Sequence, residues 1–237
     1  MTVAAVPPGR GALRVAELFG PTFQGEGPSA GQRAVFMRLS GCNLTCAWCD
    51  TPYTWDWCRF DKAGQSRELP AGDVRDWVLA RDADLVVITG GEPLIQHRRL
   101  LPLIAALTAE GRRVEIETNG TVYPGAAVAA RVSFNVSPKL ASSGVPAGRR
   151  IRPGVLRSLR DSGNAVFKFV ISGGADIAEL AGLQAELGLG PIWVMPQGVT
   201  ESGVLAGLRA LAGPALEHGW NLTTRLHVLL WGDERGH

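Results

Sequence analysis

Short apolar runs recur along the chain, and stretches with helical spacing of apolar residues separate many of them. The runs are rich in Val, Ile and Phe and lie at 34–39, 84–91, 113–120, 131–139, 165–174, 191–198 and 225–232. Amphipathic segments around 73–81 and from about 97 to 110 flank the second run. Strands separated by helices in this way are typical of βαβ units in a parallel sheet. The pattern predicts an α/β fold, either a barrel or a partly open barrel.

The chain divides into a short leading segment and one domain. Residues 1–13 are proline-bearing, and we expect them to be loose, while residues 14–237 form the domain. A strand over 14–19, a turn containing glycines and a strand over 34–39 together indicate a hairpin. The stretch from Thr51 to about Leu69 has no regular pattern, so we interpret it as an irregular insert.

Polar and glycine-rich residues follow most of the predicted strands, at the point where each strand ends. In chain order these groups read GCN, TGGE, ETNG, SPK and MPQG. The carboxyl ends of the strands in a (β/α) barrel meet at one rim, and the loops there build the active site. We therefore expect the candidate functional motifs to lie together on one rim.

Composition excludes several classes of protein. Hydrophobic residues make up 46% and charged residues 19% of the chain, as in an ordinary soluble protein. The formal net charge is only +2, which gives no reason to expect a direct nucleic-acid partner. No apolar run approaches the ~18 residues of a membrane helix. No signal-peptide pattern opens the chain, and three of the four cysteines are clustered, so we expect a cytoplasmic protein in a reducing compartment.

Three cysteines carry the strongest chemical signal. Cys42, Cys46 and Cys49 are spaced CX3CX2C on the predicted loop after the strand at 34–39, with Trp48 just before the last of them. Three thiolates can each bind one iron of a four-iron cluster and leave the fourth iron without a protein ligand. An open metal position is typical of catalytic sites, whereas structural sites are closed. The spacing therefore predicts catalysis at an iron–sulfur cluster.

Two alternatives to a catalytic cluster remain. The first is a zinc site completed by a distant ligand, although no second CxxC and no HxxxH follows, and among the histidines only His227 lies in a strand-end motif. The second is a non-catalytic module that binds a metal or transfers electrons. Both alternatives predict a chain that performs no chemistry on a small molecule.

Other motifs on the rim are weak when taken singly. TGGEP, ending at Pro93, is a common strand-to-helix turn, but its glycines would let a ligand approach the backbone and Glu92 would supply an acceptor. ETNG and SPK, at 117–120 and 137–139, can be helix caps or turns. Lys139 can be a solvated surface lysine or a partner of a carboxylate.

Arg38 and His227 are two candidate site residues that lie within predicted strands. Arg38 comes four residues before Cys42 and would point into the barrel. Burying it is costly unless an anion pairs with it, which favours a substrate carboxylate there. His227 lies in the run at 225–232, which we expect to be the last strand. A lone strand histidine is more often a core residue than a ligand.

The cysteine loop, placed after the first barrel strand, resembles that of the radical S-adenosylmethionine (SAM) superfamily. Together with FQGEG, Arg38, TGGEP, ETNG, SPK and the closing LHVLLWGDERG, it resembles the 7-carboxy-7-deazaguanine synthase family over about residues 15 to 237. The resemblance implies a (β/α) barrel trimmed relative to a full TIM barrel, a homodimer, a 4Fe–4S cluster, SAM and Mg²⁺.

The resemblance also assigns roles residue by residue. The implied ligands of the 4Fe–4S cluster are Cys42, Cys46 and Cys49, and Thr51 is the implied ligand of Mg²⁺. The implied SAM contacts are Trp48, Cys49, Asp50, Gly91, Glu92, Glu117, Ser137, Pro138, Lys139, Met195 and Gln197. The implied substrate contacts are Phe23, Gln24, Gly25, Arg38, Thr89 and His227. Cys58 is interpreted as structural or incidental, and His237 is given no role.

The implied reaction takes a small pterin, 6-carboxy-5,6,7,8-tetrahydropterin, contracts its ring and releases ammonia. It leads to queuosine-type 7-deazapurines and needs an electron donor such as flavodoxin or ferredoxin. No essential protein acid or base is expected, because the cofactor performs the difficult chemistry. A glycyl-radical-enzyme activating protein is the nearest rival, since it shares the cysteine loop and the size. It would lack FQGEG and the metal position at Thr51.

Overall fold

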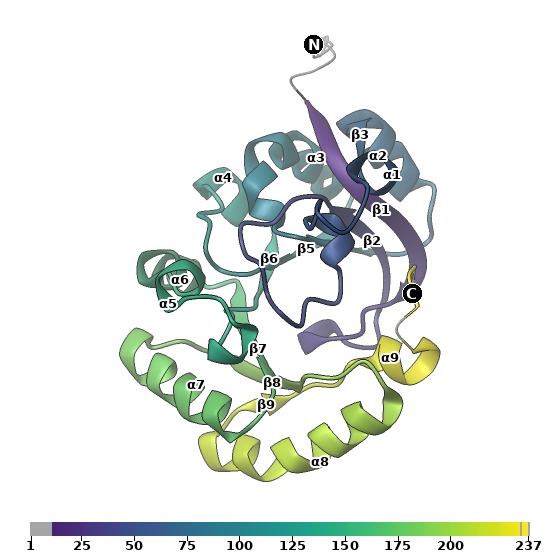
Figure 1. Ribbon diagram of the computed structural model, residues 1–237. Helices are drawn as coiled ribbons and strands as arrows, with labels where there is room; N and C mark the ends of the chain where they lie inside the picture. Colours follow the sequence, from purple (N-terminus) through teal and green to yellow (C-terminus); the bar gives the residue numbers. More distant parts are fainter. Residues whose placement is uncertain (1–10, 233, 237) are drawn as a thin grey trace.

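Nine strands make up one sheet in the part of the chain that the computed structural model describes, residues 11–232 and 234–236 (Figure 1). The strands are β1 (Ala12–Phe23), β2 (Arg33–Leu39), β3 (Arg67–Pro70), β4 (Leu85–Gly90), β5 (Arg113–Thr118), β6 (Ser133–Val136), β7 (Ala165–Ile171), β8 (Ile192–Pro196) and β9 (Asn221–Leu222). Their order is β3-β1-β2-β4-β5-β6-β7-β8-β9. From β2 to β9 every neighbouring pair is parallel, and β1 is antiparallel to both β2 and β3.

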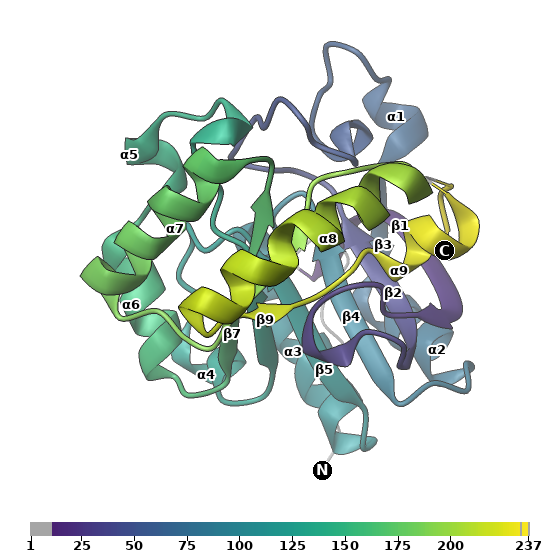
Figure 2. The same cartoon turned by 90° about the horizontal axis from the view of Figure 1, so that it is seen from below.

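The sheet curves without closing, since the described strands at its two ends, β3 and β9, do not pair with each other. Helices lie outside it (Figures 1 and 2). They are α1 (Lys62–Gln65), α2 (Ala71–Leu79), α3 (His97–Ala109), α4 (Ala126–Ala129), α5 (Ala147–Arg150), α6 (Pro153–Asp161), α7 (Gly174–Leu187), α8 (Glu201–His218) and α9 (Leu226–Trp231). Short 3-10 turns are η1 (Gly27–Ser29), η2 (Pro52–Thr54), η3 (Pro93–Gln96) and η4 (Ala141–Ser143). The predicted partly open α/β barrel is confirmed.

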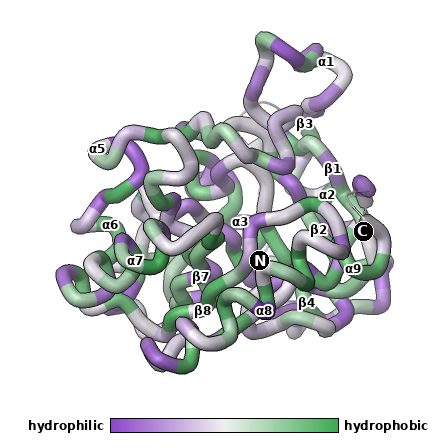
Figure 3. Tube along the Cα trace, turned by 60° about the horizontal axis from the view of Figure 1, so that its bottom comes forward, coloured by the Kyte–Doolittle hydropathy of each residue, from purple (hydrophilic) through white to green (hydrophobic). Residues whose placement is uncertain are grey.

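Alternation along the strands separates the core from the interior of the barrel. In β7, Phe167 and Phe169 are fully buried in the main hydrophobic core, and Lys168 between them points the other way. In β5, Ile116 lies in the core and Glu117 faces inward. Along α6 and α7 the trace alternates between hydrophilic and hydrophobic colours, as expected for helices with one face on the sheet (Figure 3). Because side chains alternate between the two faces of each strand, the inward-facing residues supply the polar lining of the site.

The insert after the cysteines has more regular structure than expected. It contains η2, the single-turn helix α1 and the edge strand β3, which pairs with β1 from Ala12↔Pro70 to Val15↔Arg67. Asp61 begins α1 by accepting hydrogen bonds from Ala63 N and Gly64 N. Figures 2 and 3 show α1 projecting from one rim of the sheet.

The first strand starts earlier than predicted. β1 begins at Ala12, and Leu13 is fully buried, so both belong to the sheet rather than to a loose segment. Residues 1–10 of the predicted loose segment lie outside the described residues. Among the helices that the structure describes, none is both long enough and apolar enough to cross a membrane.

The prediction of a last strand over 225–232 is wrong. The chain forms the two-residue strand β9 beside β8 and then the helix α9, with His227 in its first turn. A short continuous apolar run is compatible with a buried strand or a helix, and periodicity cannot distinguish them. A tertiary contact favours the helix over the strand here. Leu226 N donates to Gly25 O at 2.9 Å, and this hydrogen bond turns the chain toward the hairpin.

Candidate active site

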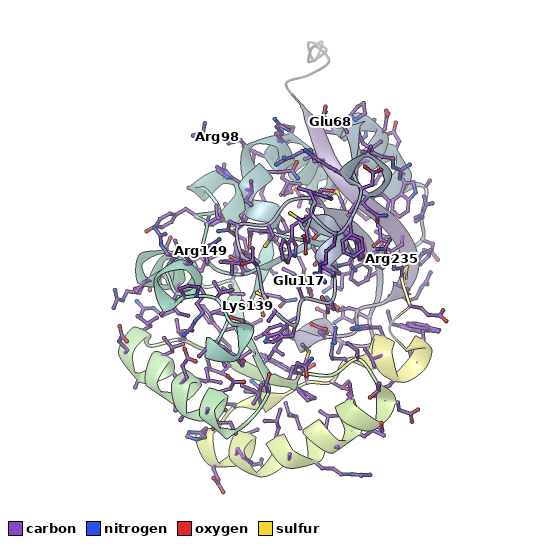
Figure 4. All side chains as sticks on the ribbon, viewed as in Figure 1. Glu68, Arg98, Glu117, Lys139, Arg149 and Arg235 are labelled. Atoms are coloured by element: carbon purple, nitrogen blue, oxygen red, sulfur yellow. The ribbon has the colours of Figure 1, made fainter. Side chains whose placement is uncertain are left out.

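One cavity of about 450 Å³ opens at the carboxyl ends of the strands. Of the residues predicted from the sequence, those that line it are Phe23, Gln24, Gly25, Arg38, Cys42, Cys46, Trp48, Cys49, Asp50, Thr51, Thr89, Gly91, Glu117, Ser137, Lys139, Met195, Gln197 and His227. Glu92 and Pro138 are not part of its lining. Figure 4 shows Glu117 and Lys139 toward the middle of the molecule, whereas Glu68 and Arg98 lie at its edge.

The cysteine loop is held in place by side chains from other strand-end loops. Trp48 Nε1 donates to Ser142 O at 3.0 Å. Asn43 Nδ2 donates to Thr121 Oγ1 at 2.7 Å. These contacts join the loop to the segments after β5 and β6, so neighbouring strands fix the loop that carries the thiols.

The three thiols fit an iron–sulfur cluster. Cys42, Cys46 and Cys49 are all free, partly buried and part of the cavity wall. In the described part of the chain, no three His, Cys, Asp or Glu side chains are grouped as ligands of one metal ion. A four-iron cluster does not require that grouping, because each thiolate binds a different iron. Three soft thiols around one space therefore match the donor set of a cluster with an open iron.

Hydrogen-bond donors face the sulfur atoms. Trp55 Nε1 donates to Cys49 Sγ at 3.3 Å, and Leu44 N donates to Cys42 Sγ at 3.5 Å. Burial raises the pKa of Cys42 to about 12, so its free thiol is protonated at neutral pH. Binding a cluster must release that proton. The donors to sulfur then help to compensate the negative charge of the bound cluster.

Gly90 and Gly91 serve the contact between two backbone segments. A Cβ on Gly91 would lie 2.2 Å from Gly41 O and 2.9 Å from Cys42 Cβ. Gly90 has a φ of +134°, and a Cβ there would lie 2.2 Å from Leu39 O. We expected these glycines to let a ligand approach the backbone. The structure shows that Gly90 lets the end of β4 approach the end of β2, and that Gly91 lets it approach the start of the cysteine loop.

The structure gives Glu92 an internal role rather than a place in the cavity. Its side chain is 1% exposed, and its two oxygens accept from Leu94 N at 2.9 Å, Thr118 Oγ1 at 2.8 Å and Asn119 N at 2.7 Å. Burial raises the pKa of this carboxyl even though the three donors oppose the shift. With these bonds made, Glu92 links the end of β4 to the end of β5.

Lys139 and the loop after β8 form a further part of the cavity wall. Lys139 Nζ donates to Ser137 Oγ at 2.8 Å and lies 5.6 Å from the centre of the Trp48 ring. Lys139 is therefore held at the cavity and is not a freely solvated surface lysine. Met195 is 3% exposed at the end of β8, and Gln197 follows it in the lining.

A network of charged side chains, largely buried except for Asp50, forms the other end of the cavity. Lys168 Nζ pairs with Glu26 and, at 3.5 Å, with Glu117 Oε1. Arg225 pairs with Glu26 Oε1 at 3.2 Å and with Asp50. Burial opposes the charge on Glu26, but Lys168 and Arg225 outweigh it and hold the pKa of that carboxyl far below its ordinary value. Three carboxylates and two basic side chains thus surround one space.

The hairpin turn and α9 meet beside this network. Gln24 Nε2 donates to Glu117 Oε1 at 3.3 Å, and Thr89 Oγ1 donates to Glu117 Oε2 at 2.8 Å. His227 faces Gly25. Burial lowers the pKa of His227, despite the opposing effect of Glu26, so its imidazole is neutral at neutral pH. The predicted substrate residues thus lie together, although the element that carries His227 is a helix.

Arg38 has an anionic partner within the protein. Arg38 Nε donates to Glu17 Oε2 at 2.9 Å, and its guanidinium carbon lies 5.5 Å from the centre of the Phe19 ring. We expected a substrate carboxylate to be the partner that makes burial of this arginine tolerable. That reasoning was incomplete, because Glu17, across the hairpin, already supplies one anion.

Sequence reasoning missed Glu17, Glu26, Lys168 and Arg225, and also the contacts of Trp55 and Asn119. Asn119 Nδ2 donates to Asn43 Oδ1 at 3.0 Å and so steadies the cysteine loop. Glu26 and Asn119 lie inside FQGEG and ETNG, so those motifs did contain a signal for them. Lys168 was detectable as a lone charge inside the apolar run AVFKFVI.

Comparison with known proteins agrees with this geometry. The sequence model of the radical SAM superfamily matches residues 38–134. The 7-carboxy-7-deazaguanine synthase of Halobacterium salinarum is 37% identical, covering 94% of this chain and 91% of the relative. The enzyme of the same name from Pyrobaculum aerophilum is 38% identical, covering 94% and 97%. The crystal structure of QueE from Escherichia coli has a TM-score of 0.72 at 27% identity, covering 91% of this chain and 95% of that one.

The open barrel and the three thiols at its rim, with the superfamily match, define a radical SAM enzyme, a class that uses a 4Fe–4S cluster and SAM. The two relatives extend the agreement over nearly the whole chain. The chain belongs to the 7-carboxy-7-deazaguanine synthase family. Their shared name favours the synthase over the activating protein considered from the sequence.

Proposed function

We propose that this protein converts 6-carboxy-5,6,7,8-tetrahydropterin to 7-carboxy-7-deazaguanine and ammonia, as a radical SAM lyase of queuosine-type 7-deazapurine biosynthesis. One observation carries the proposal. The three thiols line the same cavity as a group of fixed charges and hydrogen-bonding side chains. Together these charges and side chains surround a space of the size of a small substrate. Such a cavity suits a small polar heterocycle held next to a cofactor. The family to which the chain belongs supports the same reaction.

Cys42, Cys46 and Cys49 would hold the 4Fe–4S cluster. When bound, the cluster and SAM supply the radical that starts the ring contraction. Around them the protein would orient SAM through side chains and backbone of the cavity wall already described. These contacts would come from Trp48, Asp50, Gly91, Glu117, Ser137, Lys139, Met195 and Gln197. The positions of Glu92 and Pro138 outside the cavity lining support an indirect role for both residues.

The charged end of the cavity would bind the pterin. Glu26 is a carboxylate, so it would accept hydrogen bonds from pterin N–H groups. Neutral His227 would offer one donor and one acceptor without adding charge. Arg38 would bind the substrate carboxylate through its two terminal nitrogens, since its Nε is occupied by Glu17. Phe23, Gln24, Gly25 and Thr89 would complete this end of the site.

We also propose Mg²⁺ at Thr51. Its side chain lies in the cavity lining directly after the cysteine loop, and Thr51 Oγ1 is 3.9 Å from Cys49 Sγ. A hydroxyl oxygen suits this hard ion, which keeps most of its other positions for water and substrate oxygens. Thr51 would thus bring the metal to the boundary between the thiols and the pterin.

A homodimer, a cytoplasmic location and a flavodoxin or ferredoxin as electron donor complete the proposal. The family resemblance supports the homodimer and the need for a reductant, and the clustered cysteines, which are typical of a reducing compartment, support the location. Light scattering of the purified protein at several concentrations tests the dimer, and a monomer at every concentration would contradict it.

Anaerobic reconstitution with iron and sulfide, followed by addition of SAM, Mg²⁺, dithionite and the carboxytetrahydropterin, tests the reaction itself. We expect a product with the mass and ultraviolet spectrum of 7-carboxy-7-deazaguanine. A Cys46→Ala variant treated in the same way is the control and should form none. Cleavage of SAM without deazaguanine would contradict the proposed substrate, and zinc without acid-labile sulfide would contradict the cluster.

A further inference from the structure

Two side chains of the cavity wall share one carboxylate oxygen. Glu17 Oε2 accepts from Arg38 Nε at 2.9 Å and from Tyr53 OH at 2.9 Å. Arg38 and Glu17 are partners across β1 and β2, next to an irregularity in the register of that pair. Their side chains are only 18% and 20% exposed, so the ion pair is mostly shielded from water. Arg38 and Tyr53 line the cavity, whereas Glu17 lies behind them.

Tyr53 connects this pair to the carboxyl-terminal residues. The guanidinium carbon of Arg235 lies 3.4 Å from the centre of the Tyr53 ring, and Arg235 Nη1 donates to Gln65 Oε1 at 3.0 Å. Phe60 packs against the same ring edge-to-face, with the centres 6.4 Å apart. Arg235 therefore docks onto the insert through a cation–π contact and a hydrogen bond. The cavity lining includes residues 234–236 as well as Tyr53 and Phe60.

The contact with Glu17 decides which atoms of Arg38 remain for a ligand. Its Nε is taken, and in the described part of the chain neither terminal nitrogen of Arg38 donates to another residue. Two parallel hydrogen bonds to a carboxylate require the guanidinium plane to be fixed. Glu17 fixes this plane from behind, on the side away from the cavity.

We propose that Glu17 is a positioning residue for the substrate site, and that it couples two events. Its one oxygen orients Arg38 toward the substrate carboxylate and holds Tyr53 where Arg235 docks on it. Docking of Arg235 at the cavity wall and orientation of Arg38 thus depend on the same carboxylate. This inference rests on the proposed function, because it takes the substrate carboxylate as the ligand of Arg38.

Substitutions separate the coupled contacts. Glu17→Ala removes both hydrogen bonds, and Tyr53→Phe removes one and keeps the ring for Arg235. Arg235→Gln removes the docked cation and its hydrogen bond to Gln65 but leaves both bonds to Glu17 in place. Glu68→Gln, on the exposed face of the edge strand β3, is a matched control for a Glu17→Gln variant. Arg235→Lys, which keeps a cation near the ring, should restore most of what Arg235→Gln loses.

Steady-state kinetics with dithionite as reductant give the first readout. We expect Glu17→Ala and Glu17→Gln to raise the KM for the pterin at least tenfold while the KM for SAM stays within about twofold of wild type. Tyr53→Phe should raise the pterin KM by a smaller factor. Such a pattern indicates lost substrate binding rather than lost folding. A pterin KM no different from that of Glu68→Gln would overturn the positioning role.

Hydrogen exchange of peptides from residues 226–236 gives the second readout and needs no turnover. Exchange there should accelerate in Arg235→Gln and in Glu17→Ala, and remain near wild type in Arg235→Lys and Glu68→Gln. Unchanged exchange in Glu17→Ala would overturn the coupling. If the wild type forms no deazaguanine, the proposed function fails, and the exchange measurement still decides whether Glu17 controls docking of Arg235.

Discussion

Gly25 leaves the space that His227 occupies. A Cβ on Gly25 would lie 2.2 Å from His227 Nδ1 and 3.1 Å from its Cγ. The backbone fixes the same approach, because Leu226 N donates to Gly25 O at 2.9 Å. The first glycine of FQGEG is therefore required by the approach of a side chain from the far end of the chain. A close contact between the hairpin turn and α9 places the histidine beside the charge network.

Gly25→Ala should displace His227 and impair the pterin end of the site. The Cβ meets ring atoms of the imidazole, so the histidine or α9 must move. We expect the pterin KM to rise by about tenfold or more, with the iron content unchanged. Gly31→Ala is not a suitable control, because Gly31 has a φ of +84°, whereas Gly148→Ala adds a Cβ in open space. Wild-type KM in Gly25→Ala would contradict this account.

Gly91→Ala should damage the thiol end instead. Its Cβ would overlap Gly41 O, which is backbone and cannot rotate away, so the cysteine loop must shift. We expect several-fold less iron and acid-labile sulfide after anaerobic reconstitution. Gly72→Ala is the control, because Gly72 lies in α2 with nothing near its Cβ position. That control should be neutral or stabilising by about 0.5–1 kcal/mol. Full cluster loading in Gly91→Ala would refute the role assigned to the glycine.

Lys168→Met should destabilise the fold. Lys168 is 3% exposed and stands between Glu26 and Glu117, so its removal leaves carboxylates close together without their cation. Breaking a buried ion pair by removing one partner costs about 3–5 kcal/mol. Urea unfolding of the apoprotein measures the change in the free energy of unfolding. Arg33→Met removes an ion pair that is 57% and 94% exposed and should cost less than about 1 kcal/mol. Equal losses in the two variants would contradict the network.

Glu26 should make the free energy of unfolding depend on pH in the acid range. Lys168 and Arg225, which outweigh the effect of burial, hold its folded pKa far below the ordinary 4.5. A carboxyl with a lowered pKa contributes stability above its unfolded pKa and loses that contribution as pH falls toward the folded value. The free energy of unfolding should therefore drop as pH decreases below about 4.5, and drop less steeply in Glu26→Gln. Parallel pH profiles for the two proteins would contradict the assignment.

Thr51→Ala should weaken the response to Mg²⁺. The side chain would lose the one oxygen that the proposal assigns to the metal, while Thr51 O would still accept from Thr54 N at 3.0 Å. We expect the Mg²⁺ concentration for half-maximal activity to rise about tenfold, and Thr51→Ser to remain near wild type. An unaltered Mg²⁺ response in Thr51→Ala would remove the residue from the metal site.

Local spacing was enough to predict the chemistry, because the three thiols lie within one loop and the glycine and polar motifs mark the strand ends. The charge network could not be predicted in the same way. Lys168 and Glu26 are separated by 142 positions, and Arg225 and Glu26 by 199, so only the curved sheet brings them together. The helix that carries His227 was missed because its apolar run fits a strand equally well. Glu92 was placed in the cavity because a motif shows which residues are present and not where their side chains point.

The superfamily match over residues 38–134 covers the cysteine loop, Gly91 and Asn119 but stops before Lys168 and Arg225. The hairpin turn with Glu26 precedes it, and α9 with His227 follows it. Of the proposed pterin contacts, Arg38 and Thr89 lie inside the matched stretch, whereas Phe23, Gln24, Gly25 and His227 lie outside it. The match that identifies the superfamily therefore covers the cluster loop but only part of the proposed substrate site, and the two ends of the chain supply the rest.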